Sequence, residues 1–278
     1  MITPLPASEL GDLACNQVRF QGGSDAFVAR EEGPDARLGI YYYETASAPR
    51  KPAVVYDRKN SSACRISPDD FPEEMYASAR CFHTSGITLA LGGQARATAV
   101  SMMRRFKEQG ALISFDVNFR GNLWTGEEAR ACIEEILPLV DIFFCSEDTA
   151  RLTFRKEGSL REIMKSFTRE YPISVVASTR RVVHSPRRHS FGSLIYSGET
   201  DTFYEEEPYE NIEVLDRIGS GDAYVAGVLY GLLTDWAHPR KAVAMGNAAA
   251  AVKNTVAGDL PCMTLAEMEA LIREHHSQ

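Results

Sequence analysis

Hydrophobic and polar residues follow two alternating patterns from about residue 80 onward. Short apolar runs, typical of buried strands, are separated by longer segments with apolar residues every three or four positions, typical of amphipathic helices. The predicted strands are residues 79–87 (with a turn at their end), 111–118, 141–146 and 173–179. The predicted helices are residues 92–110, 127–140 and 159–171. A strand followed by a helix, repeated in this way, predicts parallel strands joined by crossover helices.

Two stretches depart from this alternation. Residues 37–58, "RLGIYYYETASAPRKPAVVYDR", predict two strands joined by a loop and are rich in tyrosine. Residues 191–215 predict antiparallel strands with a glycine-containing turn. We find no internal repeat and no low-complexity linker. The predicted architecture is one α/β domain over residues 1–278, with a doubly wound, mostly parallel sheet and a small β flap, or lid, that includes residues 37–58.

The composition and charge of the chain argue against nucleic-acid and membrane partners. The net charge of −8 argues against the broad basic surface that non-specific nucleic-acid binding needs. No apolar run approaches the length of a membrane span, and the first residues lack the blocks of a signal peptide, so we expect a cytoplasmic protein with no membrane partner. The six cysteines are scattered, which predicts reduced thiols and no zinc site. His275 and His276 are expected in a frayed C-terminal tail.

The segment "DRIGSGDAYVAG", residues 216–227, carries the strongest candidate chemistry. Residues 212–216 predict a strand and residues 223–233 a helix, so Gly219 and Gly221 fall at a strand-to-helix turn. The N–H groups and the dipole of a helix start attract an anion, and Asp222 is placed to accept a proton from a hydroxyl beside a phosphate. The alternative is that Asp222 caps the helix and the glycines only form a tight turn. The spacing leaves both open.

Two common phosphate-binding motifs are excluded at this turn. No Gly-Lys-Ser/Thr follows, so it is not a Walker-type loop, and the third glycine of a dinucleotide fingerprint is missing. Instead, "DRIGSGDAYVAGVLYGLL" resembles the C-terminal signature of the ribokinase family of carbohydrate kinases. The resemblance implies a ribokinase-like fold, ATP and Mg²⁺ as cofactors, an anion hole formed by Gly219, Ser220 and Gly221, and Asp222 as the catalytic base.

A second group of polar residues lies in "FDVNFRGNLW", residues 115–124. The group follows a predicted strand, and open α/β sheets bind ligands at the carboxyl ends of their strands. Asp116, Asn118 and Arg120 alternate, so we expect them to project toward a common crevice. The planar guanidinium of Arg120 suits a carboxylate or a phosphate, although a lone arginine also suits a surface ion pair.

The pattern D-x-N-x-R-x-x-L-W resembles one branch of the family, the 2-keto-3-deoxygluconate kinases, as do "FHTSGITLAL" and "RLGIYYYE" followed by "VVYDRKNSSA". The resemblance implies that Tyr41, Tyr56 and Arg58 reach a sugar acid from the flap and that Arg120 binds its carboxylate or a nearby phosphate. Asn118 and Asp259 complete the expected substrate contacts. The alternative for the two tyrosines is packing of the flap or a dimer contact.

The resemblance also implies a nucleotide site at residues 145–148, after residues 175–179, and at residues 246–259. The residues implied there are Ser146, Thr179, Gly219, Gly221 and Asn247. Ser146 and Thr149 stand where the family usually has Asn and Glu near its magnesium, so Glu147 and Asp148 are at most indirect metal ligands. The arginine-rich residues 179–192 are expected to form a loop that supplies positive charge to the triphosphate.

The N-terminal region departs from the family pattern. Residues 5–20 resemble the helix that follows the first strands, so we expect the usual opening βαβ portion to be missing. Unpaired sheet edges would favour a homodimer or higher homo-oligomer. The predicted function is ATP-dependent phosphorylation of a sugar acid, 2-keto-3-deoxygluconate, to its 6-phosphate. The alternatives are a fructokinase-like enzyme and an inactive homologue that binds a sugar or a nucleotide.

Overall fold

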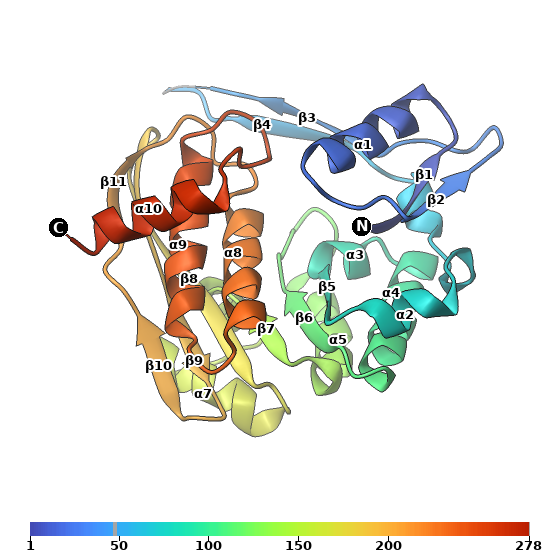
Figure 1. Cartoon of the computed structure of the whole chain (residues 1–278). Coiled ribbons are helices and arrows are strands. Elements are labelled where there is room, and N and C mark those ends of the chain that lie inside the picture. Colours follow the sequence, from blue (N-terminus) through green and yellow to red (C-terminus); the bar gives the residue numbers. More distant parts are fainter. Residues whose placement is uncertain (47–48, 278) are drawn as a thin grey trace. The chain divides into compact units, whose positions relative to one another are not determined.

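The computed structural model describes residues 1–46 and 49–277. The chain divides into two compact units, which are described separately (Figure 1). Unit 1 comprises Met1–Ile113 and Asn118–Leu139, and unit 2 comprises Ser114–Val117 and Val140–Gln278. The boundary passes through the strand β6 (Leu112–Asp116). The single domain over residues 1–278 stays a prediction.

Unit 1 contains the N-terminal strands and their helices. Its strands are β1 (Ile2–Pro6), β2 (Phe27–Glu31), β3 (Ile40–Glu44), β4 (Ala53–Asp57) and β5 (Cys81–Ser85). Its helices are α1 (Glu9–Phe20), α2 (Glu73–Ser78), α3 (Gly86–Ala90), α4 (Gly93–Glu108) and α5 (Gly126–Ile136), with short 3₁₀ turns η1 (Ser62–Arg65), η2 (Pro68–Asp70) and η3 (Leu137–Leu139). β1 and β2 are parallel and α1 is their crossover helix. The helix expected within residues 5–20 is therefore confirmed, but a strand precedes it.

The flap is the antiparallel hairpin of β3 and β4, in which Tyr41 lies opposite Tyr56 and Tyr42 opposite Val55. Residues 47–48, in the expected loop of the flap, lie outside the described residues. Tyr42 and Val55 are 60% and 63% exposed, so this face of the hairpin buries no core of its own. The homo-oligomer expected from the sequence stays a prediction.

Unit 2 contains a β-sheet and the helices α6 to α10. Its strands after β6 are β7 (Ile142–Phe144), β8 (Val175–Ser185), β9 (Arg188–Ser197), β10 (Thr202–Glu205) and β11 (Tyr209–Glu213). Its helices are α6 (Glu147–Leu152), α7 (Leu160–Glu170), α8 (Ser220–Thr234), α9 (Arg240–Asn254) and α10 (Leu265–His275). β6, β7 and β8 are parallel, whereas β9 is antiparallel to β8, β10 and β11. The predicted α/β alternation is confirmed.

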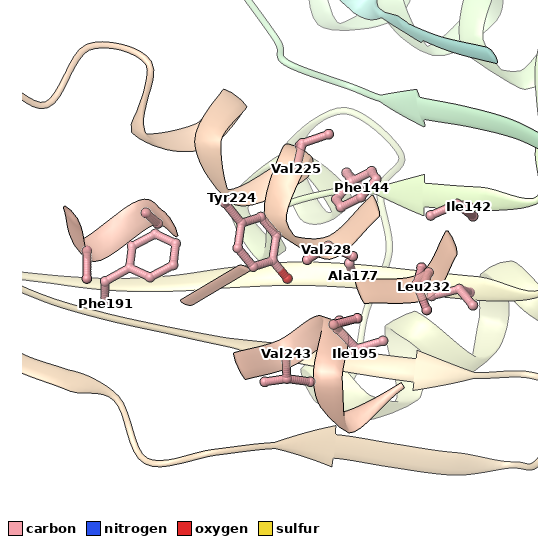
Figure 2. Packing of buried hydrophobic residues seen from close by; sticks show 14 of the residues in the cluster. Ile142, Phe144, Ala177, Phe191, Ile195, Tyr224, Val225, Val228, Leu232 and Val243 are labelled. Atoms are coloured by element: carbon pink, nitrogen blue, oxygen red, sulfur yellow. The ribbon is translucent and has the colours of Figure 1, made fainter. Parts of the chain in front are cut away.

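The core of unit 2 fixes α8 against the sheet (Figure 2). The Tyr224 ring of α8 makes an edge contact with Phe144 of β7 and a tilted contact with Phe191 of β9, at centroid distances of 6.1 and 5.8 Å. α8 and α9 lie side by side (Figure 1), so close that a Cβ on Gly227 would lie 2.5 Å from the Met245 carbonyl oxygen. The start of α8 is consequently held in place by buried contacts on two sides.

The prediction of a loop over residues 179–192 is wrong. β8 continues to Ser185 and β9 begins at Arg188, so the arginine-rich segment is a long antiparallel hairpin with only Pro186 and Arg187 between its strands. Val182 and Val183 are more than half exposed, so backbone pairing with β9, not core burial, holds this end of β8. The lack of a buried face removes the alternation by which a strand is recognised in sequence.

The C-terminal histidines correct a second expectation. The His275 ring stacks on Tyr209 at a centroid distance of 4.0 Å, and its Nε2 lies 2.9 Å from the Glu207 carbonyl oxygen. His276 Nε2 lies 3.1 Å from a carboxylate oxygen of Glu206. These contacts attach α10 to the residues before and within β11, so the end of this helix is not a frayed tail.

Candidate functional site

The glycine-rich turn before α8 is bound at several points to the end of α9. The backbone N–H groups of Leu215 and Asp216 both donate to the Asn254 carbonyl oxygen, at 2.8 and 3.2 Å. The Asp216 carboxylate accepts the N–H of Ile218 at 3.0 Å and that of Gly258 at 3.1 Å. One carboxylate thus binds the turn before α8 to the turn after α9.

The first turn of α8 presents free backbone donors. Gly219 is the N-cap, with φ of 75°, and its carbonyl oxygen accepts the N–H of Ala223 at 2.8 Å. Within the described part of the chain, the N–H groups of Gly221 and Asp222 have no acceptor, whereas Ser220 N–H donates to Arg217. Nothing lies within 4 Å of the position of a Cβ on Gly221. An anion can therefore approach these donors and the positive end of the helix dipole.

Asp222 lies at the same place, exposed and in the first turn of α8. No hydrogen bond or ion pair to its carboxylate occurs among residues 1–46 and 49–277, and no side chain caps this helix. The capping alternative therefore fails on this geometry. The carboxylate remains available to accept a proton from a ligand.

Two arginines supply positive charge near the turn. Arg181 of β8 lies opposite Phe191 of β9, on the face covered by α8, and Arg217 is part of the turn itself. Among the residues that the structure describes, neither guanidinium has a carboxylate partner. Partial burial and the neighbouring Arg217 lower the pKa of Arg181. This unpaired charge lies beside the free donors of α8.

His189 of β9 belongs to the same cluster. It is 3% exposed, and its Nδ1 is buried without a partner. Burial, followed by the charges of Arg181 and Arg217, lowers the pKa of His189. A neutral imidazole with a free nitrogen adds either a donor or an acceptor to this cationic cluster, depending on its tautomer.

The residues expected to contact the nucleotide differ in their accessibility. The Ser146 hydroxyl caps α6 by accepting the N–H of Thr149 at 3.2 Å, and Thr179 lies on β8 two residues before Arg181. Asn247 is fully buried and its Oδ1 accepts the Ser193 hydroxyl at 2.7 Å. A nucleotide on the surface would thus be separated from Asn247 by other atoms.

The expected indirect metal ligands are not gathered into a metal site. Glu147 forms an ion pair with Arg151 at 2.5 Å, whereas Asp148 is exposed at the start of α6. Within the described residues, no group of three or more His, Cys, Asp or Glu side chains is arranged to hold a metal ion.

A second cluster lies within unit 1. The Arg58 guanidinium lies over the Tyr56 ring, 4.2 Å from its centroid, and the Tyr56 and Tyr41 rings are 6.2 Å apart. The Nη2 of Arg58 is buried and has no hydrogen-bond partner. Burial and then the positive charge of Arg120 lower the pKa of Arg58. Two neighbouring guanidinium groups, one partly desolvated, make a site that an anion would stabilise.

Arg120 itself is exposed and bonded only to the main chain. Its Nη1 donates to the Phe119 carbonyl oxygen at 3.1 Å, and no carboxylate in the described part of the chain pairs with it. β6 ends at Asp116 and Asn118 has φ of 34°, in the left-handed region. The predicted alternation of Asp116, Asn118 and Arg120 is therefore wrong, because side chains alternate only in extended backbone.

Asp259 belongs with the glycine-rich turn. Its backbone carbonyl oxygen lies against Gly219, and its carboxylate is exposed. Sequence reasoning also missed several residues at this turn. Asp216, Arg217 and Lys253 were not singled out, whereas Arg181 and His189 lie in the segment 179–192 that was expected to supply positive charge. For Lys253 the available signal was a lone lysine in the alanine-rich segment 246–254.

Comparison with known proteins decides the family. Residues 26–265 match the family model described as pfkB family carbohydrate kinase. The chain belongs to this family. This pfkB carbohydrate kinase is 32% identical over 273 residues to a 2-dehydro-3-deoxygalactonokinase of Haloferax volcanii. The match covers 98% of this chain and 81% of that protein. It is 27% identical over 258 residues to a 2-dehydro-3-deoxygluconokinase of Bacillus subtilis, covering 91% and 74%.

Solved structures of carbohydrate kinases have the same fold. The crystal structure of 2-dehydro-3-deoxygluconokinase from Thermotoga maritima matches with a TM-score of 0.90 and 29% identity, over 98% of this chain and 83% of that one. A pfkB family carbohydrate kinase from Listeria grayi matches with a TM-score of 0.89 and 33% identity, over 100% and 84%. The predicted ribokinase-like fold and family are confirmed. No helix in the described part of the chain is long and apolar enough to cross a membrane.

Proposed function

We propose that this carbohydrate kinase phosphorylates a sugar acid, 2-keto-3-deoxygluconate, on its C6 hydroxyl. The observation that carries the proposal is the buried, unpartnered Nη2 of Arg58, together with the repulsion between Arg58 and Arg120, neither of which has a carboxylate partner in the described residues. Arginine binds carboxylates with paired, directional hydrogen bonds, whereas a neutral sugar offers no charge to compensate two cations. The names of the relatives, which act on 2-dehydro-3-deoxy sugar acids, support the same class of substrate.

The sugar would contact unit 1 through the flap residues as well. Tyr56 lies against the Arg58 guanidinium and near the Tyr41 ring, and these contacts restrict the orientation of its own ring. Such an aromatic ring offers a flat surface to the sugar, and its hydroxyl offers a hydrogen bond. Tyr41 and Tyr56 therefore contact the sugar in the proposal, while Arg58 and Arg120 bind the carboxylate.

Asp222 is the proposed general base. Its free carboxylate accepts the proton of the C6 hydroxyl as that oxygen forms a bond to the γ-phosphorus of ATP, and the bond to the β-phosphate oxygen breaks to give ADP. The free N–H groups of Gly221 and Asp222 would hold the migrating phosphoryl group. Both steps need an exposed acid and bare donors at one helix start, which is what α8 presents.

Arg181 and Arg217 are the proposed partners of the triphosphate. Arginine and a helix start together are suited to phosphate oxygens. Mg²⁺ would supply charge neutralisation for the phosphates, and it prefers phosphate oxygens and water to an all-protein cage. The exposed Asp148 fits an indirect contact through water, whereas Glu147 is already paired with Arg151.

A coupled assay of ADP release tests the function. The substrates are 2-keto-3-deoxygluconate, its C4 epimer 2-keto-3-deoxygalactonate, and fructose, each with ATP and Mg²⁺. We expect kcat/KM to be highest for a sugar acid. A preference for fructose would overturn the assignment in favour of a fructokinase-like enzyme, and ADP release with none of them would favour an inactive binding homologue.

A further inference from the structure

Lys253 is a buried cation that the proposed reaction does not use. It lies in the last turn of α9 and is 0% exposed. Its Nζ donates to the carbonyl oxygen of Val256 at 3.0 Å and to that of Asp216 at 3.3 Å. The two acceptors are 3 and 37 positions away in the sequence, so the ammonium joins a local carbonyl to a distant one.

The two carbonyls belong to the two turns that form the phosphoryl site. Asp216 begins the glycine-rich turn before α8, and Val256 lies in the turn that continues to Asp259. The Asp259 carbonyl oxygen in turn lies against Gly219, whose added Cβ would be 2.2 Å from it. The position of Gly219, and so of the first turn of α8, depends on how these two turns are held together.

Burying an ammonium group carries a desolvation cost in free energy that an apolar side chain does not. Removing it from water carries a penalty that lowers the pKa of Lys253, and the two carbonyl acceptors, the negative end of the α9 dipole and the charges of Asp216 and Asp259 offset it only in part. A methionine has similar length and would pack in an apolar site without this penalty. Such a charge therefore suggests a purpose other than stability.

We propose that Lys253 is a positioning residue, whose ammonium holds the turns at Asp216 and Val256 together and so fixes the Gly221 and Asp222 groups that meet the phosphoryl group. The inference rests on the proposed role of this turn in phosphoryl transfer. Asp216 performs a complementary part of the same task, because its carboxylate accepts the N–H groups of Ile218 and Gly258. Lys253 differs in that it binds carbonyl oxygens, which no carboxylate can do.

The test is the substitution Lys253→Met, with Lys241→Met on the same helix as the matched control. Lys241 is only partly buried and lies 5.3 Å from the Tyr230 ring centroid, on the first turn of α9. We expect Lys253→Met to lower kcat by roughly 100-fold, because small displacements of reacting groups cost about that much. KM for the sugar and for ATP should change little, and the melting temperature should not fall. The control should keep the wild-type kcat.

Two further measurements separate positioning from general damage. Lys253→Ala opens a space lined by the same carbonyls, so added methylammonium should restore part of kcat, whereas tetramethylammonium at equal ionic strength should not. Hydrogen–deuterium exchange of peptides covering residues 216–222 should speed up in Lys253→Met and stay unchanged in Lys241→Met. Should Lys253→Met fail to fold, Lys253→Gln serves for the same comparison.

The outcomes distinguish this inference from the function on which it rests. A wild-type kcat in Lys253→Met, or unchanged exchange at residues 216–222, would overturn the role of Lys253 and leave the kinase assignment intact. An inactive wild-type protein would overturn the proposed function, and the exchange experiment would still decide whether Lys253 holds the two turns together.

Discussion

The α-carbon of Gly219 lies directly against the backbone carbonyl of Asp259, so that a Cβ on Gly219 would be 2.2 Å from that oxygen. Gly219 also has φ of 75°, where other residues are strained. The neighbouring Gly221 differs in both respects, because the space around it is open and its φ is not positive. The two glycines of one motif therefore serve different ends: Gly219 allows the fold of the turn, and Gly221 leaves room for a ligand.

This difference predicts opposite effects of two matched substitutions. Gly219→Ala should lower the melting temperature by several degrees and abolish activity, because the strain of about 1–2 kcal/mol adds to a clash with main chain. Gly221→Ala should leave the melting temperature unchanged or raise it, since alanine stabilises a helix by about 0.5–1 kcal/mol over glycine. Its kcat should still fall, because the methyl group would occupy the approach to the first-turn donors. A fully active Gly221→Ala variant would contradict the anion site.

Asp222→Asn tests the general base. We expect kcat to fall by roughly two to four orders of magnitude, because the proton acceptor is lost while the shape is kept. The melting temperature should not change, since Asp222 makes no contact in the described structure that the amide would break. ATP affinity, measured by calorimetry, should be retained.

Glu9→Gln is the matched control for this substitution, because Glu9 is an exposed acid in the first turn of α1. It should leave kcat unchanged. An active Asp222→Asn enzyme would remove Asp222 from the chemistry and leave the turn as an anion site alone.

Arg58→Met tests the sugar-acid site. We expect KM for 2-keto-3-deoxygluconate to rise roughly 10- to 100-fold, the value of a lost charge-assisted hydrogen bond. The melting temperature should stay the same or rise, because the substitution removes a buried, unpaired donor beside the charge of Arg120. Lys51→Gln, in the loop of the same hairpin, is the control and should change neither value. An equal loss for sugar acids and fructose would show that Arg58 does not recognise the carboxylate.

Arg181→Gln tests the triphosphate contact. KM for ATP should rise about 10-fold, and KM for the sugar acid should not change. Arg187→Gln, at the exposed turn of the same hairpin, should behave as the wild type. If ATP binds both variants equally well, the charge near α8 serves another purpose.

His189 predicts a dependence of stability on acid pH. Its pKa is lowered in the folded protein by burial and by Arg181 and Arg217, so below the ordinary value of 6.5 the unfolded chain binds a proton that the folded chain does not. The free energy of unfolding should therefore fall as the pH drops from 6.5 toward the folded pKa, and level off below it. Urea titrations of wild type and His189→Asn should differ in this window and agree at pH 8. A bound triphosphate should reduce the difference, because its charge opposes the two arginines.

The sequence by itself determined the parts of this protein that depend on neighbouring residues. The alternation of apolar runs with helical periods predicted the parallel strands and their crossover helices, because burial imposes those periods locally. The glycine spacing in residues 216–222 located the start of α8, because the backbone conformation at a turn is set by the residues within it. The family signature added an expected role for Asp222.

Only the tertiary structure decided which distant residues meet. Lys253 and Asp216 are 37 positions apart, and nothing in either segment shows that the ammonium reaches that carbonyl. The charge of Arg120 lowers the pKa of Arg58, and the charge of Arg217 lowers the pKa of Arg181. The two arginines of each pair come from different segments, so these effects arise from the packing of the chain. The hairpin of β8 and β9 was hidden because the outer residues of β8 are exposed, so they show no alternation of buried and exposed positions, and they are held by pairing with β9. The local sequence pattern indicates which residues are buried and where turns form. Which charged side chains lie near one another depends on contacts between segments that are distant in the sequence.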